Sequence, residues 1–351
     1  MITTNINQMG SAKIPDKRWF CALAVSLISS VAFTTIVDAG CSCSAVGDWE
    51  TKAAEFLKID DTSVTPSSYG DAQTTTTTNQ PKTVSRSESF PNGEILKPMK
   101  GVSSSDVVLD VSNGENYAKS HIKNAIHIPS RDFLDSDGKL KSSQELSIVL
   151  GDAGISRDDP LVVYGTYESS GEAEFAFLVL RYLGQKEVKL LDGSLADWQA
   201  AGLPVESSEN KKPRTHYIPE VQSEVIAKYD YVKSNQAQIV DVRPFVEFGK
   251  GRIPGSVALD PATIVKGEKI KGVEDLSVVF DRLSKDRPIV VYSSDYSRSS
   301  LVWYALQLMG YKASIYTWED WKEHDTTDSQ TAATTSVGSP AGSKYIKLGS
   351  K

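Results

Sequence analysis

Two hydrophobic patterns alternate along residues 102–325. Longer apolar stretches over 174–183 and 300–309 predict helices, and each is followed by a glycine, which tolerates the left-handed conformation at a helix end. Short runs rich in Val, Ile and Leu predict strands over 106–111, 161–164, 238–242 and 288–292. This alternation indicates an α/β fold, with parallel sheets flanked by helices on both faces.

Two segments are too polar to fold around a core. Residues 62–98 are rich in Ser, Thr, Pro and Gly, and residues 326–351 have the same character. Such compositions cannot bury enough apolar area to offset chain entropy. We therefore expect a signal or anchor segment over 1–40, a flexible stalk over 41–101, folded halves over 102–216 and 217–325, and a disordered tail over 326–351.

The signal or anchor assignment depends on residues 19–37. This mostly apolar segment carries no charge, is about as long as a bilayer-spanning helix, and follows the basic residues Lys13, Lys17 and Arg18. A basic flank ahead of such a segment keeps the N-terminus in the cytoplasm and sends the rest across the membrane. The sequence thus predicts an exported chain, either membrane-anchored or periplasmic or extracellular.

Three routes of processing remain open. Ala39-Gly40-Cys41 resembles the end of a bacterial lipobox, in which Cys41 would be lipidated, although Asp38 departs from the aliphatic residue of that pattern. Val37-Asp38-Ala39 has the small-residue spacing of an ordinary cleavage site. The third route is an uncleaved anchor.

The two halves are an internal duplication. Val108-Leu109-Asp110-Val111 matches Ile239-Val240-Asp241-Val242 at a separation of 131 residues. Residues 161–164 match 289–292 at a separation of 128. Each half closes with a tryptophan, Trp198 or Trp321, in a similar setting.

The second half carries motifs of a known family. Asp241-Val242-Arg243, Gly251-Arg252-Ile253-Pro254-Gly255-Ser256 and the terminal element over 316–321 resemble signatures of rhodanese domains. The resemblance covers residues 102–325, is weaker in the first half, and matches the tandem arrangement of thiosulfate and mercaptopyruvate sulfurtransferases. It implies two tandem rhodanese-like domains.

The loop expected to carry the family's chemistry departs from the pattern. In an active member it reads C-x-x-x-x-R, and its thiolate carries a transferred sulfur atom as a persulfide. Here residues 293–298 retain the spacing to Arg298 but begin with Ser293, and the three cysteines of the chain all lie before residue 44. The corresponding first-half loop, residues 165–170, has neither Cys nor Arg. The sequence therefore predicts a protein without sulfur transfer, against the alternative of a thiosulfate or 3-mercaptopyruvate sulfurtransferase.

Two interpretations of the second loop remain open. Hydroxyls, backbone N–H groups and one guanidinium ahead of a helix can form a cradle for thiosulfate, sulfate or phosphate. Alternatively, Arg298 pairs with a neighbouring acid such as Asp295, and the serines cap the helix. The candidate anion-binding residues are Ser293, Ser294, Ser297, Arg298 and Ser299.

Other residues have structural interpretations. Asp110 and Asp241, each at a strand end, are expected to accept hydrogen bonds from loop N–H groups. Trp198, Trp303 and Trp321 are expected to fill cores or the contact between the halves, as is Trp318.

Charge and composition exclude several classes of function. Forty-five acidic residues against thirty-eight basic ones give a formal charge of −7, without the basic excess that phosphate-backbone binding needs. The four histidines have no HxxxH or HExxH spacing, and no glycine-rich nucleotide fingerprint occurs. We expect no nucleic acid, metal or cofactor, and a binding or scaffolding role with an unidentified protein partner.

Overall fold

The computed structural model describes residues 85–326, which contain both expected folded halves. The predicted signal or anchor segment and Cys41 lie outside the described residues, as do residues 327–351. Among the helices of the described part, none is long and apolar enough to span a membrane.

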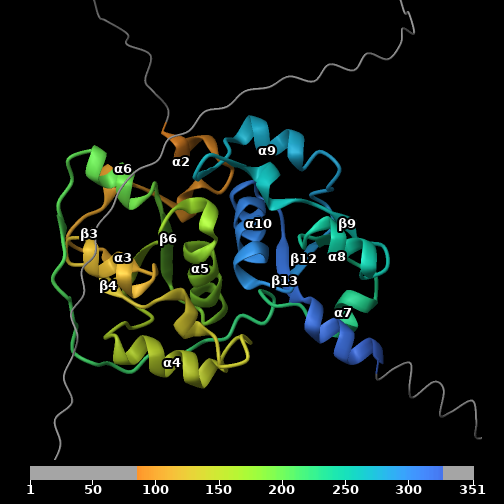
Figure 1. Cartoon of the computed structure of the whole chain (residues 1–351), viewed down its shortest axis with the longest axis horizontal. Helices are drawn as coiled ribbons and strands as arrows, with labels where there is room; N and C mark the ends of the chain where they lie inside the picture. Colours follow the sequence, from red (N-terminus) through yellow and green to blue (C-terminus); the bar gives the residue numbers. More distant parts are fainter. Residues whose placement is uncertain (1–84, 327–351) are drawn as a thin grey trace, which may run out of the picture. The chain divides into compact units, whose positions relative to one another are not determined.

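The first half is built on a five-stranded, fully parallel sheet (Figure 1). Its strands, in spatial order, are β1 (Leu96–Pro98), β6 (Glu187–Asp192), β5 (Pro160–Tyr164), β2 (Val107–Asp110) and β4 (Ile126–His127). Its α-helices are α2 (Arg86–Ser89), α3 (Gly114–Lys119), α4 (Ser143–Asp152), α5 (Glu172–Tyr182) and α6 (Leu195–Ala200). Short 3-10 turns are η1 (Gly93–Ile95), η2 (Met99–Gly101), η3 (Ser130–Phe133) and η4 (Glu168–Ser170), and β3 (His121–Ile122) pairs with β7 (Val205–Glu206).

The second half repeats this plan with a four-stranded parallel sheet. Its strands are β13 (Ala313–Thr317), β12 (Ile289–Ser293), β8 (Gln238–Asp241) and β9 (Val257–Ala258). Its helices are α7 (Tyr229–Lys233), α8 (Phe245–Lys250), α9 (Val273–Val279), α10 (Tyr296–Leu308) and a helix over 318–326, with the turn η5 (Pro261–Ile264). The hairpin β10 (Val265–Lys266) and β11 (Lys269–Ile270) is antiparallel.

Both faces of each sheet are buried, as the near-continuous apolar runs predict. In β12, Val291 belongs to the large core cluster that includes α10, and Val290 belongs to a smaller cluster with Trp321 on the other face. In β5, Val163 likewise belongs to the large core cluster, whereas Val162 belongs to a smaller cluster with Trp198 on the other face. The predicted fold class is confirmed.

Helices α5 and α10 join the two halves (Figure 1). The ring of Phe177 on α5 contacts Tyr304 on α10, with centroids 5.1 Å apart, and Phe175 stacks on Tyr296 at 5.3 Å. The core is continuous across this contact. Trp303 is buried within it, as expected.

The boundary predicted at residue 101 is wrong. β1 pairs in parallel with β6, with Leu96 opposite Leu190, and Phe90 is buried in the shared core. The composition of 85–101 resembles that of the polar segment before it, so sequence reasoning assigned it to the stalk. A few apolar side chains with partners about 100 residues away suffice to fold it into the first half.

Candidate functional site

The predicted loop lies at the carboxyl end of β12, where α10 begins. β12 runs between β13 and β8, so its last residue, Ser293, is 2% exposed. The Ser293 Oγ accepts a hydrogen bond from the Asp295 N–H at 3.2 Å. The hydroxyl thus faces the loop's own backbone.

Asp295 is the N-cap of α10. Its carboxylate accepts a hydrogen bond from the Ser297 N–H at 2.8 Å. A helix N-terminus attracts negative charge through its unsatisfied N–H groups. Here the chain's own carboxylate provides that charge.

The remaining candidate residues face different directions. Arg298 donates from Nε to the Val242 carbonyl at 3.0 Å, whereas Ser299 is buried and donates to the carbonyls of Asp295 and Tyr296. Ser294 is exposed, and Ser297 is half-buried. The five candidates share one loop and helix turn, but the Ser299 hydroxyl points back into the helix.

Ser294 opens onto a cavity of about 470 Å³ between the two halves. Four carboxylates line it: Asp137 from the first half, and Glu319, Asp320 and Glu323 from the helix over 318–326. The Lys139 Nζ lies 3.3 Å from a Glu323 carboxylate oxygen. We call these residues the acidic cleft.

A buried ion pair stands beside the loop. Asp241, at the end of β8, accepts from the Arg243 N–H at 2.9 Å and from the Arg243 Nη2 at 2.6 Å. The Tyr292 hydroxyl donates to the same carboxylate at 2.5 Å, and burial raises the pKa of Tyr292 to about 12. The Arg243 guanidinium also lies over the Trp318 ring, 3.9 Å from its centroid. The expected hydrogen bond to a loop N–H is confirmed.

Asp110 has the same position in the first half but no arginine partner. It accepts from the Ser112 N–H at 2.9 Å, from the Ser112 hydroxyl at 2.6 Å and from the Tyr164 hydroxyl at 2.5 Å. Asp110 and Asp241 therefore occupy equivalent positions, and each accepts hydrogen bonds from a loop N–H and a buried tyrosine hydroxyl. Asp241 is neutralised by Arg243, whereas the partners of Asp110 are uncharged.

Sequence reasoning missed an ionic cluster in the first-half loop. Glu168 is mostly buried, and Arg86 donates to both of its carboxylate oxygens at 3.1 Å. Arg86 also donates to Asp192 at 2.5 Å and to the Ile270 carbonyl at 2.6 Å. Burial raises the pKa of Glu168, and Arg86 opposes the shift. The cluster ties the segment before β1 to both halves.

Glu174, on the first turn of α5, is fully buried. Neither of its carboxyl oxygens makes a hydrogen bond to another described residue. Burial raises the pKa of Glu174 well above that of an exposed carboxyl, with Glu168 and Glu172 adding to the shift. No periodicity in the sequence marks it, because it lies within an apolar helix.

The histidines that could have acted as a base for Ser293 lie elsewhere. His324 stacks on Tyr229, with centroids 4.6 Å apart, and its Nδ1 lies 2.8 Å from the Asp320 carbonyl oxygen. His216 is exposed in the segment that joins the halves. Within residues 85–326, no three His, Cys, Asp or Glu side chains are grouped to hold a metal ion.

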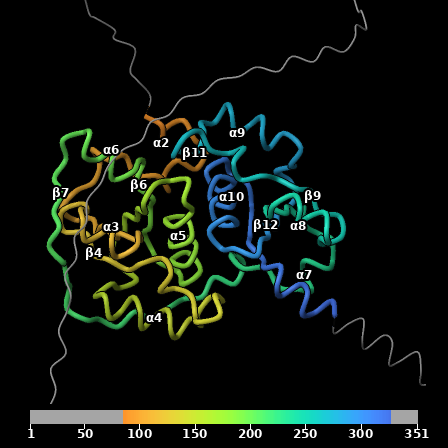
Figure 2. The backbone as a smooth tube through the Cα atoms, viewed as in Figure 1, coloured from red at the N-terminus to blue at the C-terminus, as the bar shows by residue number. Residues whose placement is uncertain are grey.

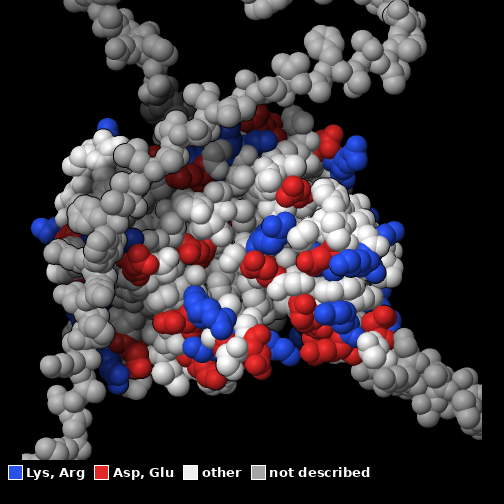
Figure 3. All heavy atoms as spheres, viewed as in Figure 1, with Lys and Arg blue, Asp and Glu red and all other residues white. Residues whose placement is uncertain are grey.

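The charged side chains on the face shown in Figure 3 are of mixed sign. Lysines and arginines are interspersed with aspartates and glutamates there, without a continuous basic stripe on that face. This distribution agrees with the small net charge of the whole chain, −7.

Comparisons with known proteins match both halves. A family model described as a rhodanese-like domain matches residues 93–201 and 227–324. The sulfur carrier protein TtuD of Thermus thermophilus is 29% identical over 238 residues, which are 58% of this chain and 83% of that protein. The 3-mercaptopyruvate sulfurtransferase of Escherichia coli is 24% identical over 236 residues, 60% of this chain and 84% of the enzyme.

Solved structures share the fold. The crystal structure of SseA from Escherichia coli, described as a 3-mercaptopyruvate sulfotransferase, superimposes with a TM-score of 0.58 at 21% identity. The match covers 63% of this chain and 97% of SseA. The wild-type structure of EanB gives a TM-score of 0.59 at 17% identity, over 66% of this chain and 68% of EanB.

Proposed function

Because the chain belongs to the rhodanese-like domain family and carries one such domain in each half, we propose that it is a binding or scaffolding module without sulfur transfer. The observation that carries this proposal is Ser293, which stands at the loop position where the resemblance calls for a cysteine. A persulfide requires a sulfur atom at that position.

A serine nucleophile is not supported by the geometry either. A hydroxyl needs an adjacent general base, because its pKa is far above that of a thiol. The Ser293 Oγ is buried and bonded to the Asp295 N–H, and His324 is engaged with Asp320 and Tyr229. We propose no hydrolytic role for this loop.

The sequence suggested small oxyanions as ligands of this loop. The loop has few groups that would attract an anion. Asp295 already occupies the N-terminus of α10, and the acidic cleft adds further negative charge next to Ser294. Arg298 is the one candidate that favours an anion. We therefore propose weak binding of thiosulfate, sulfate or phosphate, limited by Asp295.

The acidic cleft supports binding of a protein partner more strongly than the loop at Ser293 supports binding of an anion. It lies between the halves, about 470 Å³ in volume, and four carboxylates surround it. A basic segment of another protein complements such a cleft. We propose that export and a lipid or apolar anchor place this cleft outside the cytoplasm, in reach of a membrane-associated partner.

The experiment is affinity capture from detergent-solubilised membranes with the full chain as bait. The proposal expects a protein that binds the wild-type chain and is lost when Glu319 and Glu323 are changed to lysine. A matched charge reversal at the distant, exposed Glu187 and Glu209 is the control and should retain the protein. Capture that is equal for all baits, or absent, would contradict a scaffolding role for the cleft.

The rival function is thiosulfate or 3-mercaptopyruvate sulfur transfer. It is favoured by the relatives named above, one of which is a 3-mercaptopyruvate sulfurtransferase. Turnover of either donor by the wild-type chain would establish this function.

A further inference from the structure

In the first half, an extended segment crosses the edge of the sheet. Residues 207–215 follow β7, contain no helix and run along the outside of the first half (Figure 2). The Asn210 side-chain amide donates to the Ala125 carbonyl, next to β4, at 3.2 Å. The Thr215 N–H donates to the Gly151 carbonyl, near the end of α4, at 2.9 Å. These residues, which we call the covering segment, therefore fill the strip between the edge strand and α4.

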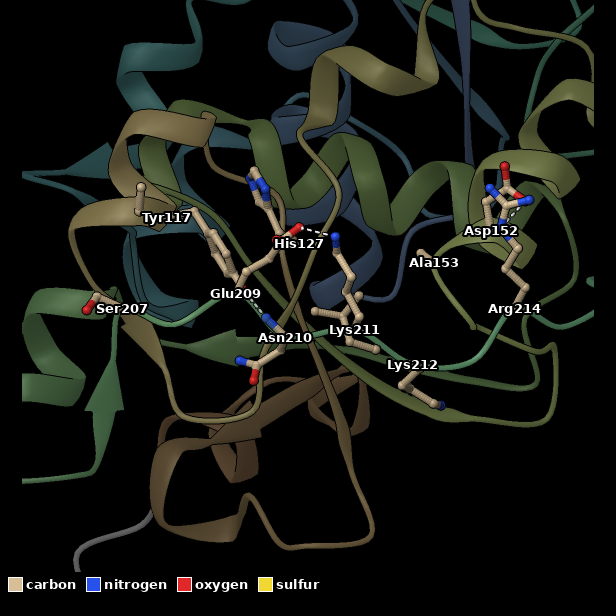
Figure 4. A pocket seen from close by; sticks show the side chains of 12 residues that line it. Tyr117, His127, Asp152, Ala153, Ser207, Glu209, Asn210, Lys211, Lys212 and Arg214 are labelled. Atoms are coloured by element: carbon tan, nitrogen blue, oxygen red, sulfur yellow. Dashed lines mark hydrogen bonds and ion pairs between the residues drawn. The ribbon is translucent and has the colours of Figure 1, made fainter.

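Opposite charges hold the covering segment against the first half. The Lys212 Nζ lies 3.3 Å from an Asp159 carboxylate oxygen, and the Arg214 Nε lies 3.5 Å from an Asp152 carboxylate oxygen. Figure 4 shows Arg214 pointing toward Asp152 beside a cavity of about 670 Å³. Residues two positions apart lie on the same side of an extended chain, as Lys212 and Arg214 do here. The covering segment is thus basic where the surface beneath it is acidic.

The equivalent edge of the second sheet is exposed. Val257 in β9 pairs with Val240, as Ile126 in β4 pairs with Leu109, so the two edge strands correspond. Ile126 is 5% exposed, whereas Val257 is 52% exposed. Beside Val257 lies a cavity of about 440 Å³, and its described lining residues all belong to β8, β9, α9 and the loops next to them. Exposed strand edges are sites at which another chain can dock.

The charges around this cavity are reversed relative to the first half. Helix α9 begins 130 residues after α4, and both helices bury a leucine at the fourth position, so Asp152 corresponds to Arg282. Asp159 and Arg287 each precede a proline that leads into β5 or β12, so they correspond as well. Both arginines are exposed and line the cavity, and none of its described lining residues is acidic. We call these lining residues the basic groove.

We propose that the basic groove binds an extended acidic segment of a partner protein, in the place that the covering segment has in the first half. Two acidic residues of the partner, two positions apart, pair with Arg282 and Arg287. An apolar side chain of the partner enters the cavity, whose walls include Ile239, Leu259 and Leu283. Complementary charge sets the register of such a segment and disfavours basic ones.

The basic groove and the acidic cleft select opposite charges. Four carboxylates line the acidic cleft between the halves, whereas the basic groove belongs to the second half alone. A segment that suits one of these sites is repelled by the other. The proposal for the basic groove is therefore independent of the scaffolding role proposed for the acidic cleft, and either can fail without the other.

Synthetic peptides test the proposal on the full chain. The acidic peptide has the sequence of residues 208–217 with Asn210→Leu, Lys212→Glu and Arg214→Glu, and the control peptide has glutamine instead of both glutamates. The leucine supplies the apolar side chain. Fluorescence anisotropy is measured at low ionic strength, because exposed ion pairs weaken with salt. The acidic peptide should bind the wild-type chain about fivefold more tightly than the control peptide does.

Reversing the charge of the basic groove should reverse this preference. Arg282→Asp with Arg287→Asp gives the second half the two aspartates of the first half. It should weaken binding of the acidic peptide about tenfold, and strengthen binding of a peptide with Asn210→Leu alone about fivefold. The matched control is Lys119→Asp with Lys186→Asp, which changes two exposed lysines of the first half by the same total charge. This control should leave both affinities unchanged.

Amide hydrogen exchange locates the bound peptide. Saturation of the wild-type chain with the acidic peptide should slow exchange over residues 257–259, because the peptide covers the edge of β9. Unchanged exchange there would overturn the proposal. Equal affinity of the acidic and control peptides for the wild-type chain, or no binding of either, would also overturn it without any variant. Equal losses in the two double variants would show that net charge, and not the basic groove, attracts the peptide.

Discussion

Arg86 forms a bidentate ion pair with Glu168, in which each Nη nitrogen lies 3.1 Å from a different carboxylate oxygen. The same Nη2 donates to the Ile270 carbonyl in the second half, and the Ile270 N–H donates to Glu168 at 2.9 Å. In the first-half loop, a structural ion pair thus holds the two halves together. The loop has become part of the interface between them.

We expect Arg86→Ala to destabilise the protein by about 3–5 kcal/mol, because it leaves the buried Glu168 without its cation. Urea unfolding measures this loss. Lys119→Ala, which removes an exposed partner of Glu115, is the control and should cost less than about 1 kcal/mol. Equal effects of the two substitutions would contradict a structural role for the Arg86 cluster.

Glu174 should make stability fall as pH rises. The pKa of the Glu174 carboxyl is higher in the folded chain than in the unfolded chain. At a pH above the ordinary carboxyl pKa, the folded state therefore holds a proton that the unfolded state has lost, and the free energy of unfolding decreases as the pH rises. Glu174→Gln removes this titration, and its stabilising effect relative to wild type should grow between about pH 5 and pH 8. Thermal unfolding across that range tests it, with the exposed Glu187→Gln as the control. A pH-independent difference would show that Glu174 does not titrate with folding.

We expect removal of the tyrosine hydroxyl bonded to the buried aspartate to cost more stability in the first half than in the second. Tyr164→Phe should cost about 1–3 kcal/mol, because Asp110 keeps only its bonds from Ser112. Tyr292→Phe should cost about 1 kcal/mol, because Arg243 still neutralises Asp241. Chemical unfolding of the two variants compares them under one condition. A larger loss for Tyr292→Phe would be inconsistent with the role assigned to Arg243.

Asp295→Asn should improve oxyanion binding. Asparagine caps helices as well as aspartate does, so the change removes the charge and keeps the cap. Loss of one negative charge next to the ligand is worth about 1 kcal/mol in water, or roughly fivefold in Kd. Calorimetric titration with thiosulfate, sulfate and phosphate measures it, with the exposed Asp286→Asn as the control. Unchanged affinity would show that the loop is not where anions bind.

The sequence predicted the parts of the fold that local pattern determines. The strands over 106–111, 161–164, 238–242 and 288–292 lie within two residues of the observed ones, because buried parallel strands read as apolar runs. The internal duplication matched the strands of one half with those of the other, and both halves fold around a parallel sheet. The apolar helices begin earlier than expected, since α10 starts at Tyr296, where Asp295 caps it.

Other features depend on contacts between residues far apart in the chain. Arg86 forms hydrogen bonds with Glu168, Asp192 and Ile270, and no local sequence pattern predicts these contacts. The assignment of β1 to a stalk failed for the same reason. The tyrosines that hold Asp110 and Asp241 did leave a signal, because Tyr164 and Tyr292 occupy the same position in the repeat.

The measurement that tests the central claim most directly is sulfur transfer by the wild-type full chain. Thiosulfate or 3-mercaptopyruvate is supplied as donor and cyanide as acceptor, with an active 3-mercaptopyruvate sulfurtransferase as positive control, and thiocyanate is measured. We predict no thiocyanate above the protein-free background, because Ser293 cannot hold a persulfide. Thiocyanate formation by the wild-type chain would contradict the account. Repeating the assay with Cys21, Cys41 and Cys43 changed to serine would then show whether those thiols carry the sulfur.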